Sequence, residues 1–63
     1  MTITVERISK GGYEVTLEAE KFGGYIVSMY EDRGGIWYTA KESKAYADRA
    51  KAEATFRRYA RGI

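Results

Sequence analysis

Apolar and polar side chains alternate strictly along residues 13–20. The apolar positions fall on one side of an extended chain: Tyr13, Val15, Leu17 and Ala19. The polar positions fall on the other side: Glu14, Thr16, Glu18 and Glu20. A period of two is typical of a strand with one packed face and one face in water. The pattern therefore predicts a strand whose outer face is acidic.

Three Gly-Gly pairs divide the first half of the chain, at Gly11-Gly12, Gly23-Gly24 and Gly34-Gly35. Glycine adopts positive φ without steric cost, so such pairs favour the tight turns that reverse a strand. They predict an antiparallel β-meander of three to four strands, at about residues 2–9, 13–21, 25–31 and 36–40. In the first of these strands, Ile3 and Val5 are expected on one face.

The chain has one Trp, six Tyr and two Phe, more aromatic residues than a core of this size buries easily. If Tyr25, Val27 and Met29 join the core, Ile26 and Tyr30 lie on the outer face beside Ser28. Trp37 and Tyr38 are neighbours on a strand and must face opposite sides, so one of them joins that outer face. The candidate partner-binding residues are therefore the following: Ile26, Tyr30, Trp37 and Tyr38. The alternative is that they only stabilise the sheet as cross-strand pairs, or that residues 40–47 cover them.

Residues beyond the last Gly pair are rich in Ala, Lys and Arg and predict one helix. Thr39 begins a possible capping box, which would give a helix of some twenty residues. That helix would place Asp48 and Arg49 on the buried face, so we prefer Asp48 as N-cap and a helix over residues 49–61, stopped by Gly62. Its apolar side is expected to cover the sheet: Ala52, Phe56, Tyr59 and Ala60, with Ile63 just beyond.

These elements predict the α+β class: an antiparallel β-meander packed on one face by a single C-terminal amphipathic helix. The chain has 63 residues and is expected to form one small domain over residues 1–63. It has no Cys, so packing alone must hold it together. Its beginning already alternates like a strand and no segment is apolar enough to cross a bilayer, so we expect a soluble, cytoplasmic protein.

The residues of common catalytic sites are missing from the sequence. There is no His and no Cys, so Ser-His or Cys-His pairs and ordinary zinc sites cannot form. The Gly pairs do not match a phosphate-binding loop. The pairs Glu18/Glu20 and Glu31/Asp32 are better interpreted as a solvated strand face and a turn. We therefore expect no enzyme activity, no metal and no cofactor.

Charge is distributed unevenly along the chain. Residues 1–35 have four basic and six acidic side chains, whereas residues 36–63 have seven basic and three acidic ones. On the predicted helix, the basic side chains away from the apolar side are candidate contacts to an anion or nucleic acid: Lys51, Arg57, Arg58 and Arg61. Glu53 lies four residues before Arg57 and is expected to neutralise part of this stripe. The alternative is that the helix macrodipole alone favours these cations.

A meander followed by one helix is similar in topology to the arm-type DNA-binding domains of phage integrases and to the plant AP2 domain, which read DNA with the sheet face. Here the predicted outer face of the second strand is acidic and would repel phosphate. The arrangement also resembles, in size and shape, very small phage and mobile-element proteins, including some anti-CRISPR inhibitors. That resemblance implies a protein that occupies a surface of a larger complex.

Two functions follow as hypotheses. The first is a non-catalytic binding module that contacts another protein through the aromatic outer sheet face, an exposed edge strand, or both. The second is a nucleic-acid-binding domain that uses the basic helix. Because an open sheet leaves free edges, both a monomer and an edge-to-edge homodimer are compatible with the sequence.

Overall fold

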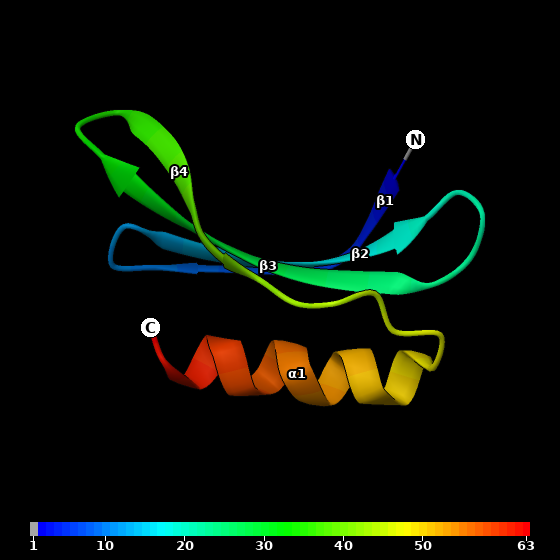
Figure 1. Ribbon diagram of the computed structural model, residues 1–63. Helices are drawn as coiled ribbons and strands as arrows, with labels where there is room; N and C mark the ends of the chain where they lie inside the picture. Colours follow the sequence, from blue (N-terminus) through cyan, green and yellow to red (C-terminus); the bar gives the residue numbers. More distant parts are fainter. Residues whose placement is uncertain (1) are drawn as a thin grey trace.

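The computed structural model describes residues 2–63, which form a four-stranded antiparallel sheet and one helix (Figure 1). The strands are β1 (Thr2–Lys10), β2 (Tyr13–Glu20), β3 (Tyr25–Arg33) and β4 (Ile36–Glu42), in the spatial order β1-β2-β3-β4. The helix α1 (Arg49–Arg61) lies across one face of the sheet. The predicted α+β meander is confirmed.

Glycine pairs form all three turns of the meander, and each of their six residues has a positive φ. The Gly23-Gly24 pair between β2 and β3 shows why glycine is favoured at these turns. Gly24 has φ of +90°, and a Cβ built there would lie 3.4 Å from the Tyr46 carbonyl oxygen. A side chain at this position would therefore face both an unfavourable backbone conformation and a close neighbour. The turns are specified by the sequence in the way that the repeated pairs predict.

The core lies between α1 and the two central strands. Its buried apolar residues come from β2, β3 and α1: Val15, Leu17, Val27, Met29, Ala52 and Phe56. Tyr59 and Ile63 pack against this cluster, as the helical spacing predicts. Because α1 packs mainly on β2 and β3, the same face of the outer strands β1 and β4 is left largely uncovered.

β1 departs from the simple alternation that the sequence predicts. Its pairing with β2 shifts between Thr4 and Glu6, which is the mark of a β-bulge. Val5 packs against the core, but Ile3 is 67% exposed although its partner Ala19 lies on the inner face. Ile3 and Val5 therefore both lie on the helix side of the sheet, as predicted, but only Val5 is covered, since α1 does not reach the beginning of this edge strand.

The helix begins where Asp48 can cap it. The Asp48 side chain accepts a hydrogen bond from the Ala50 N–H at 2.9 Å, and Gly62 follows the last turn. The alternative helix from Thr39 is wrong, because β4 continues to Glu42 and Tyr46 then pairs with the backbone of Tyr25. Among residues 2–63 no helix has the length and apolar character needed to cross a membrane.

Two small polar residues are buried at the centre of the outer sheet face. Thr16 and Ser28 are cross-strand partners, and they are 5% and 1% exposed. No second layer of backbone covers this face (Figure 1), so the longer side chains around them must shield them. Ser28 Oγ donates to Glu42 Oε2 at 3.3 Å, whereas Thr16 Oγ1 has no hydrogen-bond partner among the described residues.

Replacing Thr16 by Val is expected to stabilise the fold by about 1 kcal/mol, because an unpaired buried hydroxyl is exchanged for a methyl group of the same shape. The matched control is Thr55→Val in α1, where Thr55 Oγ1 donates to the Tyr46 hydroxyl at 3.0 Å. That change removes a hydrogen bond and should destabilise by about 0.5–1.5 kcal/mol. Urea unfolding followed by circular dichroism measures both. A Thr16→Val variant no more stable than the parent would show that this hydroxyl is satisfied.

Candidate functional site

The outer face of the sheet, opposite α1, carries three of the four predicted partner-binding residues. The pairing register places Trp37 opposite Asp32 and Tyr30 opposite Thr39 on this face, with Ile26 further along β3. Trp37 is 50% exposed, whereas Tyr30 and Ile26 are half-buried. Tyr30 and Trp37 are diagonal neighbours, close enough for large side chains to touch a common partner.

Tyr38 lies on the other face of the sheet. It pairs with Glu31 on the helix side, and the Arg33 guanidinium lies 5.5 Å from the centre of its ring. The four aromatic and aliphatic candidates therefore do not form one surface. Residues 40–47 do not cover the outer face either, because residues 40–42 continue β4 and Tyr46 pairs with Tyr25 and packs against the core.

Carboxylates surround the outer-face aromatics. By register this face carries five acidic side chains: Glu14, Glu18, Glu20, Asp32 and Glu42. Arg7 is its one basic side chain among the described residues. The formal charge of this face is therefore −4, which leaves +6 for the other side chains of a protein with a total of +2. The side chains outside this face thus carry a net charge of the opposite sign.

Hydrogen bonds across neighbouring strands engage most of these carboxylates. Glu14 accepts from Ser9 at 3.1 Å and lies 3.9 Å from Arg7, and Asp32 accepts from the Gly35 N–H in the β3–β4 turn. Glu18 accepts from Thr2 at 3.4 Å. Within residues 2–63 no cluster of three or more potential ligands could hold a metal ion. The carboxylates therefore give the face its charge without forming a built cation site.

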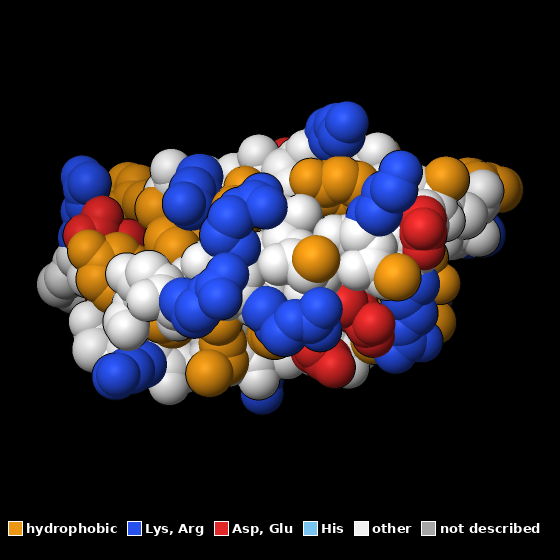
Figure 2. All heavy atoms as spheres, turned by 90° about the horizontal axis from the view of Figure 1, so that it is seen from below, with side chains coloured by type: hydrophobic (Ala, Val, Ile, Leu, Met, Phe, Trp, Pro, Cys, Tyr) orange, Lys and Arg blue, Asp and Glu red, His pale blue; other side chains and the backbone are white. Residues whose placement is uncertain are grey.

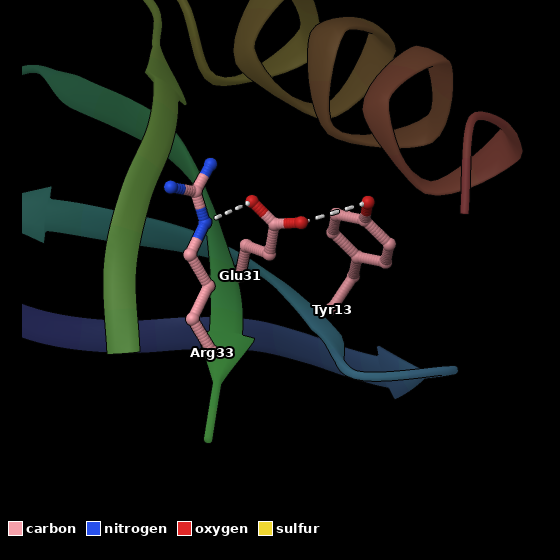
Figure 3. Close-up of polar contacts among 3 residues, drawn as sticks. All are labelled: Tyr13, Glu31 and Arg33. Atoms are coloured by element: carbon pink, nitrogen blue, oxygen red, sulfur yellow. Dashed lines mark hydrogen bonds and ion pairs between the residues drawn. The ribbon is translucent and has the colours of Figure 1, made fainter. Parts of the chain in front are cut away.

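Glu31, the neighbour of Asp32 in sequence, lies on the opposite face in a chain of polar contacts (Figure 3). Its Oε1 accepts from Arg33 Nε at 3.0 Å and its Oε2 accepts from the Tyr13 hydroxyl at 3.2 Å. Each of the two carboxylate oxygens thus accepts one hydrogen bond. The contact ties β2 to β3 at the end of the sheet near the C-terminus of α1.

Lys and Arg side chains dominate the side of the molecule that α1 presents to solvent (Figure 2). The four predicted basic contacts are all exposed, but helical geometry divides them between two flanks. Arg57 and Arg61 border the side of α1 that faces β1. Lys51 and Arg58, seven residues apart, share the other flank. The basic surface of α1 thus has two sides, with Arg57 and Arg61 toward β1 and Lys51 and Arg58 away from it.

Glu53 does not neutralise Arg57, contrary to the sequence-based expectation. It forms an ion pair with Arg49, whose Nε lies 3.2 Å from Glu53 Oε2. The spacing of four residues is the same in both directions, so the sequence could not choose between them. Consequently, in the part of the chain that the structure describes, Arg57 and Arg61 have no acidic side chain within ion-pair distance.

Tyr46 lies in the segment between β4 and α1 and contacts the helix on the side of Arg58. Its hydroxyl accepts the hydrogen bond from Thr55, and this bond is the main cause of a lowered pKa of Tyr46. Desolvation opposes the shift, whereas the Arg58 guanidinium and the charge of Lys44 add to it. Neither Thr55 nor Tyr46 stood out in the sequence as a contact, since the apolar spacing of α1 gives no reason to bury Thr55.

A groove on the β1 flank of α1 was not expected from the sequence. It has a volume of about 660 Å³ and is lined by residues of β1 and α1: Ile8, Ala54, Phe56, Arg57, Ala60 and Arg61. Ile8 is 41% exposed although it pairs with the core residue Val15. Strict alternation from Ile3 and Val5 would place Ile8 on the outer face; the bulge between Thr4 and Glu6 turns it toward the helix side, where α1 leaves it uncovered.

Comparisons with protein-family models, with curated proteins and with solved structures found no match to this chain. The class of this protein is therefore described from the fold and surfaces of the chain itself. It is a small α+β domain in which an acidic, partly aromatic sheet face lies opposite a basic helix.

Proposed function

We propose that this chain is a non-catalytic binding module whose outer sheet face docks on a basic surface of a protein partner. The observation that carries the proposal is the position of Trp37, half-exposed and diagonal to Tyr30, within a face of formal charge −4. Exposed Trp and Tyr side chains supply much of the binding energy in protein interfaces. The surrounding carboxylates favour a partner rich in Lys and Arg.

The sheet is suited to this role because it presents the aromatic side chains on a rigid surface. Tyr30 lies on β3, which is paired on both sides, and Trp37 lies on β4, next to the turn that Asp32 closes. Docking therefore costs little backbone ordering, since the strands are already paired. The carboxylates around these aromatic side chains repel phosphate and so disfavour nucleic acid on this face.

A capture experiment tests the proposal. The immobilised protein is incubated with cell lysate, and bound proteins are compared between the parent and the variants Trp37→Thr and Tyr38→Thr. Tyr38 is the matched control, since it is 48% exposed on the same strand but faces the helix side. We expect Trp37→Thr to lower capture of the specific partner about tenfold or more, as loss of an interface anchor does, and Tyr38→Thr to leave it unchanged. Equal effects of the two changes would contradict the assignment of the face.

A second candidate function, nucleic-acid binding through α1, rests on one specific observation. Within residues 2–63, Lys51, Arg57, Arg58 and Arg61 are exposed and form no ion pair with an acidic side chain. Such a helix face supports contact with a phosphate backbone, and that contact would weaken steeply with salt. If random duplex and single-stranded oligonucleotides show no mobility shift even at low salt, this second function is removed.

A further inference from the structure

The groove on the β1 flank of α1 combines an apolar floor with a cationic rim. Ile8, Phe56 and Ala60 supply apolar surface, and the guanidinium groups of Arg57 and Arg61 lie one helical turn apart beside it. Its volume of about 660 Å³ is within the range of ordinary ligand sites. Among the described residues neither Arg57 nor Arg61 forms an ion pair, so both rim arginines are available to an anion.

The charges on β1 differ between the two ends of the groove. Lys10 follows Ile8 on the same face of β1, and Glu6 precedes it, also on that face. The β1–β2 turn and the C-terminus of α1 lie at the same end of the molecule (Figure 1), so Lys10 and Arg61 share that end. A negatively charged group is therefore favoured toward Lys10 and Arg61 and disfavoured toward Glu6.

The free edge of β1 borders the same groove. β1 is the first strand in the spatial order and pairs only with β2, so half of its backbone N–H and C=O groups face away from the sheet. The bulge between Thr4 and Glu6 leaves the stretch around Ile8 regular. An added strand would lie about 4.8 Å beyond β1 and turn every second side chain toward the groove.

We propose that this groove and the edge of β1 together bind an extended acidic peptide segment of a protein partner. The peptide pairs with β1 as a fifth strand and places an apolar side chain against Ile8 and Phe56. Carboxylates two and four residues further along share that face and reach Arg57, Arg61 and Lys10 as charge-assisted contacts. This site lies on the helix side of the sheet and is separate from the outer-face surface of Trp37.

The lining of the groove favours a peptide over nucleic acid. A phosphate backbone would gain nothing from Ile8 and would engage both basic flanks of α1, including Lys51 and Arg58. The groove instead places its two arginines next to apolar surface and beside unpaired backbone groups. That combination matches a strand with alternating apolar and acidic positions on one face.

The test uses capped synthetic hexapeptides and the complete, isotope-labelled protein. The probe is Thr-Leu-Thr-Glu-Thr-Glu, whose Leu and two Glu share one face of a strand. Control peptides replace both Glu by Lys, or Leu by Ser. Titration followed by amide chemical shifts is expected to move the signals of residues 7–10 and 57–61, with the Lys peptide inactive and the Ser peptide weaker.

Matched variants separate this site from a general basic surface. Arg57→Gln with Arg61→Gln should weaken the acidic probe about tenfold or more, because two charge-assisted contacts are lost. Lys51→Gln with Arg58→Gln removes the same charge from the other flank and should change binding less than about twofold, a change small against a tenfold loss. The variant Arg57→Lys with Arg61→Lys keeps the charge at both positions. If it binds the probe well, the loss of binding in the double-Gln variant comes from the lost charge and not from altered folding. Trp37→Thr should leave the probe unaffected, which separates this test from the capture experiment.

Three outcomes would overturn the proposal. The first is the absence of shifts with the acidic probe up to about 1 mM, the weak end of measurable affinity. The second is equal loss in the two double-Gln variants, which would indicate long-range attraction only. The third is tighter binding of a random duplex oligonucleotide with dependence on Lys51 and Arg58, which would assign α1 to nucleic acid instead.

Discussion

Replacement of Leu17 by Ala is expected to leave most of the protein unfolded or to lower its melting temperature severely. Leu17 is fully buried on β2 beneath α1 and, within residues 2–63, is the largest side chain that is completely inaccessible. Leu-to-Ala changes at such positions cost about 2–5 kcal/mol, because transfer energy is lost and a cavity remains. A domain of 63 residues has a free energy of unfolding of only about 3–9 kcal/mol. The loss from this single substitution is therefore comparable with the total stability.

Urea unfolding followed by circular dichroism measures this effect, and Ile3→Ala is its control. Ile3 is also aliphatic and lies on a strand, but it is 67% exposed, so its loss should cost under about 1 kcal/mol. Similar losses for the two variants would mean that α1 does not cover β2 as described. In that event the distinction between an inner and an outer sheet face would fail, and with it both proposed surfaces.

Local chemistry made the architecture predictable. The three Gly pairs set the turns, because their residues all need positive φ, and the alternation around Leu17 set the inner face. Asp48 located the start of the helix, since starting earlier would have buried Asp48 and Arg49. These signals act over a few residues and depend little on the rest of the chain, which is why they could be interpreted from the sequence.

The orientation of Trp37 and Tyr38 was left open although a signal for it was present. The two-residue turn at Gly34-Gly35 pairs Arg33 with Ile36. Counting in steps of two from the buried Met29 puts Arg33, and therefore Ile36 and Tyr38, on the inner face. Trp37 must then face outward. Register transmitted through a tight turn thus decides which aromatic side chain is available on the acidic face.

The groove could not be predicted because it depends on how far one helix covers a sheet of four strands. Helical spacing identifies which side of α1 is buried, but not which strands it lies on. The same limit explains why helical spacing could not show which basic residues of α1 lie toward β1. Only the position of α1 over β2 and β3 shows that Arg57 and Arg61 border β1 whereas Lys51 and Arg58 do not.

The two proposed surfaces are compatible because they differ in charge and in location. The outer face is acidic and favours a basic surface, whereas the groove has two free arginines and favours an acidic strand. A partner that meets one face is disfavoured at the other by repulsion. The arrangement would allow the chain to hold two different protein segments at once, on opposite sides of one thin sheet.

Replacement of Phe56 by Ala is expected to release α1 from the sheet and thereby abolish the folded state at ordinary temperature. Phe56 is 8% exposed and is the largest of the three buried side chains of the helix, beside Ala52 and Thr55. The change should cost about 3–5 kcal/mol, comparable with the whole stability of a domain of this size. A helix of 13 residues is marginal alone in water, so its ellipticity at 222 nm reports docking directly.

Phe56→Leu is the control, because an apolar side chain of similar size should be tolerated at a cost under about 1.5 kcal/mol. We therefore expect Phe56→Ala to lose both the helical signal and the dispersed amide spectrum, while Phe56→Leu keeps them. The sheet has no other helix to cover its apolar face among the described residues, so the loss of docking exposes Val15, Leu17 and Val27 together. Retention of a native amide spectrum by Phe56→Ala would show that the sheet is stable without α1, and the groove could then not depend on the packing of this side chain.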